Sequence, residues 1–317
     1  MSFPGGAPGR RERPKGVTPA PGAGAGENPL GVEPYGSTPR ETLRYAQGDI
    51  KTRKEEKTHV MELYFIRHGQ SINNANWNNP DYQESPDPTL TEMGREQARL
   101  LADFLKKNQT ITNEKDWNLQ NRYGFGLTHV YTSLMERAAF TAAPIAQALD
   151  IPLVAWKEIH EEGGIFSRGD KRSTPQSGSV DKSNIVGLPG RPRSFFMENF
   201  RTLTLPDDLD ETGWWNRPFE AEEQRQPRAD QVFADLLARH RDQEGQPEQR
   251  VALVSHGGFF MRLLSAMLKL PWRQAAHGLK SWFTLNNCAI SRFDIYGDEI
   301  SVAYINRTDH LPDRLIT

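Results

Sequence analysis

From residue 61 onward, segments with the composition of buried strands alternate with segments that have the periodicity of helices. The strand-like segments are short, apolar and rich in β-branched or aromatic residues, and they cover 61–66, 127–131, 151–156 and 251–255. The helix-like segments repeat apolar residues every three or four positions and cover 92–107, 136–149, 231–240 and 259–268. Residues 285–295 and 300–306 resemble a closing pair of strands. This alternation predicts a three-layer α/β/α domain around a mostly parallel central sheet.

The first 60 residues lack this pattern. Residues 1–40 contain 9 Gly and 8 Pro, so they cannot bury enough surface to offset their conformational entropy. We expect residues 1–60 to be a disordered extension, or to precede a true first residue at Met61. The folded domain is then expected over residues 61–317.

Charge and cysteine content narrow the classes of partner and compartment. The formal net charge of -2 gives no strong attraction to nucleic acid or to an acidic membrane, so we expect neither as a partner. The single cysteine, Cys288, is expected to be a small buried side chain in a reducing, cytoplasmic compartment. The most apolar stretch, 251–272, contains His256, Arg262 and Lys269, and we therefore predict that it belongs to the core and does not span a membrane.

The segment 163–227 interrupts the alternation of strands and helices. It is rich in Gly, Pro, Arg and Asp, and it carries the aromatic pairs Phe195-Phe196 and Trp214-Trp215. A segment of this length between regular elements is usually a functional lid or a disordered insertion. Because aromatic side chains are costly to leave in water, we predict a lid insertion.

The first predicted strand ends in side chains that suit an anion. It runs into Arg67-His68-Gly69, with Asn74 shortly after. The planar fork of Arg67 suits phosphate oxygens, and a neutral His68 is a competent nucleophile. Gly69 lets the backbone come close to a ligand, and Asn74 can donate a further hydrogen bond. Taken alone, a tripeptide of this kind is more often a polar turn from strand to loop.

A second arginine follows the strand 127–131, within the stretch from Ser133 to Ala138. If it lies at the end of a neighbouring strand, Arg137 could bind the same anion as Arg67. The alternative is a helix start in which Ser133 is the N-cap and Glu136 completes a capping box, which would leave Arg137 on the surface.

A third polar strand end is Ser255-His256-Gly257-Gly258. A helix N-terminus at the glycines would offer free N–H groups to an anion, and His256 would donate to it. The alternative for His256 is a core histidine with its hydrogen bonds satisfied. Because the carboxyl ends of parallel strands meet at one edge of a sheet, the three strand ends together predict one anion pocket.

In this order, the motifs resemble those of the histidine phosphatase superfamily, the phosphoglycerate mutase-like proteins. The resemblance covers roughly residues 61–306 and is carried by Arg67-His68-Gly69-x-Ser71-x-x-Asn74, Leu90-Thr91-x-x-Gly94, Ser133 to Ala138 with Thr141-Ala142, Ser255-His256-Gly257, and Asn287. It implies a phosphoglycerate mutase-like fold and a reaction without metal or cofactor, in which His68 is phosphorylated on Nε2. It also implies that phosphoryl oxygens are bound by a set of pocket residues: Arg67, Gly69, Asn74, Arg137, His256 and Gly257.

The family also places a proton-donating glutamate after the strand that follows the Arg137 helix. Its pattern of an apolar residue, any residue and a glutamate before glycine fits Ile159-His160-Glu161. Glu158 fits the pattern less well, so we assign the role to Glu161 and keep Glu158 as the alternative.

Three functions remain as hypotheses. The preferred one is a phosphomonoester hydrolase that acts on a small phosphorylated metabolite, with water resolving phospho-His68. The second is a phosphoglycerate mutase, but cofactor-dependent mutases carry a Glu-Arg-His-Tyr-Gly stretch after the acid glutamate, where this chain has Gly163-Gly164-Ile165-Phe166. The third is a non-catalytic phosphate-binding module, which would be expected if the nucleophile or the acid were missing.

Overall fold

The computed structural model describes residues 59–113, 118–168, 185–240, 248–270 and 282–317. All of these residues belong to one unit of the chain, Gly48–Thr317. The expected extension over 1–60 falls outside the described residues except for its last two positions, which begin the first strand. Residues 169–184 of the predicted lid also lie outside them.

A seven-stranded sheet in the order β6-β3-β2-β7-β1-β8-β9 forms the middle layer of the described unit. Its strands are β1 (His59–Arg67), β2 (His129–Thr132), β3 (Leu153–Ala155), β6 (Leu203–Thr204), β7 (Arg250–Ser255), β8 (Ile290–Tyr296) and β9 (Glu299–Arg307). The five strands from β6 to β1 pair in parallel, whereas β8 pairs antiparallel with both β1 and β9. The prediction of a mostly parallel sheet is therefore confirmed.

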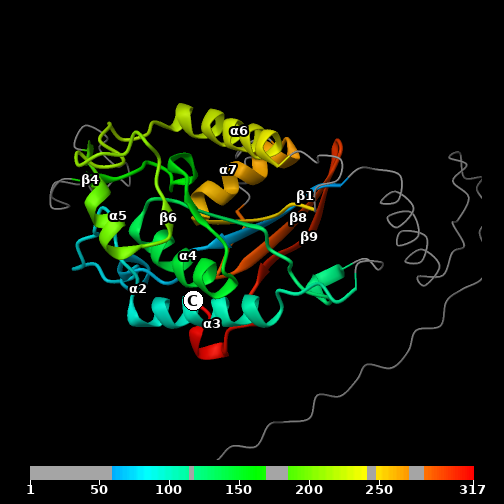
Figure 1. Ribbon diagram of the computed structural model, residues 1–317. Coiled ribbons are helices and arrows are strands. Elements are labelled where there is room, and N and C mark those ends of the chain that lie inside the picture. Colours follow the sequence, from blue (N-terminus) through cyan, green and yellow to red (C-terminus); the bar gives the residue numbers. More distant parts are fainter. Residues whose placement is uncertain (1–58, 114–117, 169–184, 241–247, 271–281) are drawn as a thin grey trace, which may run out of the picture. The chain divides into compact units, whose positions relative to one another are not determined.

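Two pairs of long helices cover the two faces of this sheet (Figure 1). The helices α3 (Glu92–Lys107) and α4 (Glu136–Leu149) pack on one face, and α6 (Glu222–Arg239) and α7 (Gly257–Leu268) pack on the other. The central strand β1 serves both layers, because Leu63 and Phe65 point into the α6–α7 core while Tyr64 and Ile66 point into the α3–α4 core. The predicted three-layer α/β/α arrangement is confirmed.

Short elements connect these layers. They are α2 (Ile72–Ala75), α5 (Arg193–Asn199), the hairpin strands β4 (Phe166–Arg168) and β5 (Ile185–Gly187), and the 3₁₀ turns η1 (Leu119–Asn121), η2 (Lys157–Ile159) and η5 (Asp313–Leu315). No helix within the described ranges is long and apolar enough to cross a membrane.

Two element boundaries differ from the sequence prediction by five residues or more. The strand expected from residue 285 begins only at Ile290, since Cys288 has a positive φ of 58° and breaks the extended run. The helix expected from residue 231 begins at Glu222 and contains Pro227. Its first turns lack apolar periodicity because they are held by ion pairs, including those that join Glu222 to Arg225 and Arg262.

The segment 163–227 does not form one separate insertion. Its strand β6 joins the main sheet as an edge strand beside β3, and its last residues begin α6. Trp214 and Trp215 are each only 4% exposed. They belong to a core cluster with Leu134 and Met135, which lie just before α4. These contacts explain why the aromatic residues are present, and the role of the segment as a lid stays a prediction.

Candidate active site

The carboxyl ends of three neighbouring parallel strands bring the predicted pocket residues together. His68 follows β1, His256 follows β7, and Arg137 lies in the first turn of α4, after β2. His68 is 3% exposed, His256 is fully buried and Arg137 is 8% exposed. The rings of His68 and His256 have their centroids 5.2 Å apart. The structure therefore brings these three side chains together in one buried cluster.

Hydrogen bonds fix the orientation and the tautomer of His68. Its Nδ1 lies 2.7 Å from the carbonyl oxygen of Gly69, which can only accept, so the ring proton sits on Nδ1. Arg137 Nε donates to His68 Nε2 at 3.2 Å, which requires a free lone pair on that nitrogen. The nitrogen that faces the pocket arginine is therefore the nucleophilic one.

The surroundings keep both pocket histidines neutral. Burial lowers the pKa of His68 well below its usual value, and the positive charges of Arg137 and Arg67 lower it further. Burial, followed by the charge of Arg137, lowers the pKa of His256 in the same direction. Near neutral pH, His68 has a lone pair on Nε2 and His256 has one N–H to donate.

Several buried nitrogen atoms around His68 have no hydrogen-bond partner within the described part of the chain. They are the Nε of Arg67 and both ring nitrogens of His256, one of which carries the N–H of the neutral ring. Arg67 is fixed at its other end, where Nη1 donates to the carbonyl oxygen of Leu285. An unpaired buried donor costs roughly 1–3 kcal/mol, and a bound anion removes that cost. These donors, together with Arg137, are suited to a phosphoryl group beside His68.

Glu161, not Glu158, lies at this pocket. Both oxygens of the Glu161 carboxylate accept hydrogen bonds from the first turn of α7, from the N–H of Gly258 at 3.1 Å and of Phe259 at 2.9 Å. Its negative charge acts on Arg67 and Arg137. The side chain of Glu158 is 41% exposed and lies 3.5 Å from Arg217.

Buried ion pairs hold the loop that carries Glu161. The neighbouring Glu162 is paired with Arg225 of α6 and Arg262 of α7. Arg228 of α6 donates to the carbonyl oxygens of Glu158 and His160, at 2.7 Å and 3.1 Å. Glu161 is thus anchored from both helices of one layer.

The glycines of the site allow close backbone approaches. A Cβ on Gly69 would lie 2.6 Å from the carbonyl oxygen of Gly94 in α3, so only glycine fits there. The N–H of Gly69 donates to Thr141 of α4 at 2.9 Å. Gly257 is different, since its missing Cβ points toward Arg67 Nε at 3.8 Å with room to spare. Gly257 therefore lies beside Arg67.

Asn74 has a mainly supporting position. Its Oδ1 accepts from the N–H of Ser71 at 3.2 Å and from Asn287 Nδ2 at 3.2 Å. Asn287 also donates to the carbonyl oxygen of His68 at 2.9 Å. Asn287, the late asparagine of the sequence motif, thus positions His68 through the backbone of that residue. The spacing of the motif alone does not reveal this role.

The alternative in which Ser133 caps α4 and leaves Arg137 on the surface is wrong. The N-cap is Met135, whose side chain makes no capping hydrogen bond. The N–H of Glu136 instead donates to the carboxylate of Asp87 at 3.1 Å. Asp87 also lies 3.7 Å from Arg137 Nη1. Sequence analysis missed Asp87, because a cap supplied by a residue 49 positions away leaves no local signal.

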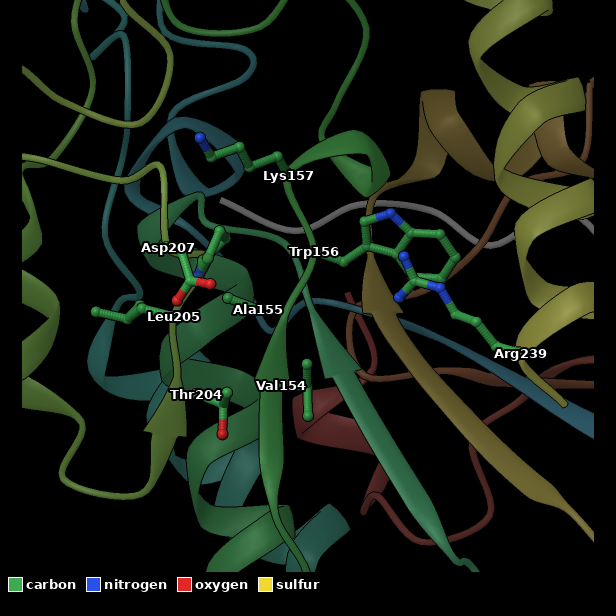
Figure 2. A pocket seen from close by; sticks show the side chains of 9 residues that line it. Val154, Ala155, Trp156, Lys157, Thr204, Leu205, Asp207 and Arg239 are labelled. Atoms are coloured by element: carbon green, nitrogen blue, oxygen red, sulfur yellow. The ribbon is translucent and has the colours of Figure 1, made fainter.

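A groove at the edge of the sheet shares no lining residue with this pocket. It has a volume of about 440 Å³ and is lined by Val154, Ala155, Trp156, Lys157, Thr204, Leu205, Pro206, Asp207 and Arg239. Figure 2 shows the guanidinium of Arg239 over the indole of Trp156, 4.0 Å from the ring centroid. None of the predicted site residues lines it. Within the described ranges, no group of three or more His, Cys, Asp or Glu side chains is placed to hold a metal ion.

This chain is similar to several known proteins. The "Probable phosphoglycerate mutase GpmB" of Yersinia pestis is 26% identical over 237 residues, which cover 74% of this chain and 85% of that protein. A solved alpha-ribazole phosphatase from Shigella flexneri is 20% identical, with a TM-score of 0.45, over 78% of this chain and 96% of that one. A mycobacterial glucosyl-3-phosphoglycerate phosphatase is 21% identical, with a TM-score of 0.47, over 78% of this chain and 99% of that one.

The sequence profile of one family matches the chain in two stretches, residues 63–113 and 197–308, which make up just over half of its length. The first stretch contains the nucleophile candidate His68, and the second contains His256. The chain therefore belongs to the histidine phosphatase superfamily, branch 1.

Proposed function

We propose that the protein is a phosphomonoester hydrolase that works through a covalent phosphohistidine on His68. One observation carries the proposal: a buried, neutral His68 carries its lone pair on Nε2, the nitrogen that lies beside the guanidinium of Arg137. The unpaired donors of Arg67 and His256 border the same space. Phosphoryl transfer needs mainly positioning and neutralisation of charge, and this arrangement offers both.

In the first step, the bond from phosphorus to the ester oxygen breaks as His68 Nε2 bonds to phosphorus. Arg67, Arg137 and His256 hold the phosphoryl oxygens in position. A protonated Glu161 gives its proton to the departing oxygen, so the alcohol leaves neutral. In the second step, water attacks phosphorus as the bond from phosphorus to His68 Nε2 breaks, and the water gives a proton to Glu161. Inorganic phosphate leaves, and His68 is regenerated.

A mutase is the second candidate, and the name of the Yersinia pestis relative is what favours it. In a mutase, phospho-His68 would return the phosphoryl group to a different oxygen of the substrate. The turn after Glu161 speaks against it, because Gly163 and Gly164 have positive φ of 89° and 76°. A side chain on Gly164 would overlap the indole of Trp215. This turn therefore has no room for the larger side chains that cofactor-dependent mutases carry after the acid glutamate.

The substrate that we propose is a small phosphorylated metabolite. The absence of a nucleic-acid partner, the cytoplasmic location and a reaction that needs no metal or cofactor stay predictions. An assay of the purified full chain with and without a chelator tests the last of these.

Release of phosphate from p-nitrophenyl phosphate tests the central claim. We expect His68→Ala to abolish turnover, and His129→Ala, which removes a half-buried histidine from outside the pocket, to keep it. Rapid quenching with ³²P-labelled substrate should trap an acid-labile, base-stable adduct in the active protein. Turnover that survives His68→Ala would refute the mechanism.

Two further measurements separate the alternatives. Conversion of 3- to 2-phosphoglycerate that depends on added bisphosphate would favour the mutase. Phosphate binding without any turnover would favour the non-catalytic module. Glu161→Gln should slow hydrolysis of alkyl phosphates strongly, whereas Glu158→Gln should not.

A further inference from the structure

A buried carboxylate lies directly behind the pocket arginine. Asp87 is in the loop before α3, and the side chains of Asp87 and Arg137 are only 10% and 9% exposed. Asp87 Oδ1 accepts from the N–H of Glu136 and lies 3.7 Å from Arg137 Nη1. Asp87 Oδ2 is buried and has no hydrogen-bond partner among the described residues. Since Arg137 Nε faces His68, the one guanidinium connects Asp87 to the nucleophile.

Two more charges surround this carboxylate. Glu136, the first residue of α4, is 4% exposed and is paired with Arg191 from the segment before α5. The charged groups that act on Asp87 are thus Arg137 and Glu136 of α4 together with Arg191. The two cations favour an ionised Asp87, while the negative charge of Glu136 opposes it.

The balance of these effects places the ionisation of Asp87 in the physiological range. Burial is the largest influence and raises its pKa to about 7, although Arg137 and Arg191 act in the lowering direction. An uncharged Asp87 leaves the full charge of Arg137 to a phosphoryl group. An ionised Asp87 shares Arg137 with it and adds a negative charge behind the pocket.

We propose that Asp87 is a positioning residue that sets how strongly Arg137 holds the phosphoryl group, and that Arg191 adjusts this strength from the segment before α5. The proposal rests on the proposed function only in taking the space beside His68 as the phosphate site. Asp87 itself needs no contact with substrate, because it acts through Arg137.

Binding of inorganic phosphate to Asp87→Asn, measured by calorimetry without turnover, tests this role. The asparagine keeps an oxygen that can accept from the N–H of Glu136, but it cannot ionise. We compare the two proteins by the ratio of their dissociation constants for phosphate, wild type over variant. Phosphate itself ionises identically in both measurements, so its effect on binding cancels in this ratio. We expect this ratio to be close to one about one pH unit below 7 and to rise by about tenfold above it, as Asp87 loses its proton in the wild type.

Asp103→Asn is the matched control, because Asp103 forms an exposed pair with Arg99 on the outer face of α3. Its ratio should stay flat across the same pH range. A flat ratio for Asp87→Asn, or tighter binding by the wild type above pH 7, would overturn the proposal. Neither result depends on catalysis, whereas failure of the proposed function would appear as turnover that survives His68→Ala.

Arg191→Met provides a second test that keeps Asp87 in place. Loss of this cation should raise the pKa of Asp87. The ratio is then taken between Arg191→Met and the double variant Arg191→Met/Asp87→Asn. Its rise should move to higher pH. Arg201→Met, which changes an exposed arginine after α5, is the control and should leave the rise unmoved. An unmoved curve in Arg191→Met would refute the part that we assign to Arg191.

Discussion

A single methyl group on Gly258 tests the role of Glu161. A Cβ at this position would overlap Glu161 Oε1 and would lie 3.2 Å from its carboxyl carbon. To restore ordinary contact, the carboxylate must retreat by about 1 Å from the N–H groups of Gly258 and Phe259. A displacement of that size costs on the order of 100-fold in rate when the group must meet a reacting atom. We expect Gly258→Ala to lose about this much in kcat/KM toward an alkyl phosphate.

The choice of leaving group makes this experiment specific. An alkoxide needs a proton as it departs, but a nitrophenolate leaves well without one. The variant should therefore keep its kcat/KM toward p-nitrophenyl phosphate within about threefold, as Glu161→Gln should. The ratio kcat/KM is the right quantity, because it reports phosphorylation of His68 and not the later attack by water.

Folding does not obscure the result. Alanine is favoured over glycine within a helix by about 1 kcal/mol, so the thermal midpoint of Gly258→Ala should not collapse. Gly297→Ala, in the turn between β8 and β9, is the control. Its positive φ of 54° should cost an alanine about 1 kcal/mol of stability, but its Cβ would meet no atom within 4 Å, so the variant should keep both activities. Equal losses on both substrates, or no loss on the alkyl phosphate, would refute the assignment of Glu161 as the positioned acid.

Two further predictions concern stability. Arg292→Met should destabilise the fold by about 3–5 kcal/mol in urea unfolding, because it removes the guanidinium that pairs with the buried carboxylates of both Glu62 and Asp294. Arg314→Met, which breaks an exposed pair, should cost less than about 1 kcal/mol, and equal losses in the two variants would contradict this. Stability should also fall as the pH drops below about 6.5, since burial lowers the pKa of His240 to about 4 and the unfolded chain then takes up the proton first. At pH 5 this histidine alone should cost roughly 1–2 kcal/mol, and a His240→Gln variant whose pH dependence matches the wild type would argue against it.

The sequence was sufficient for the elements that carry the pocket. Arg67 and His68 end one apolar strand, and His256 follows another, so pairing the strands in parallel is enough to bring these side chains to one edge. The burial of Arg137 could not be predicted in this way, because it depends on the residue at which α4 begins. Local capping rules favoured Ser133 as the cap, but the helix takes its partner from Asp87.

Contacts between distant segments explain the remaining differences. The first turns of α6 were missed because they carry charges in place of an apolar pattern, and Glu222 pairs across to Arg262 of α7. The backbone at Cys288 turns with a positive φ so that its N–H can donate to the carbonyl oxygen of Arg67 at 3.0 Å. Neither feature has a local signature, since each is defined by a partner that lies far away along the chain.

The way in which residues 163–227 join the core limits how this protein can be shortened. Trp214 and Trp215 pack with Leu134 and Met135, directly before the helix that carries Arg137. Strand β6 also covers the edge of β3. Deleting the whole segment would remove the apolar side chains that pack at the start of α4 and would expose a strand edge, so we expect the proposed phosphate pocket to be lost together with the segment. Trimming to obtain a minimal enzyme must therefore leave β6 and the tryptophan pair in place.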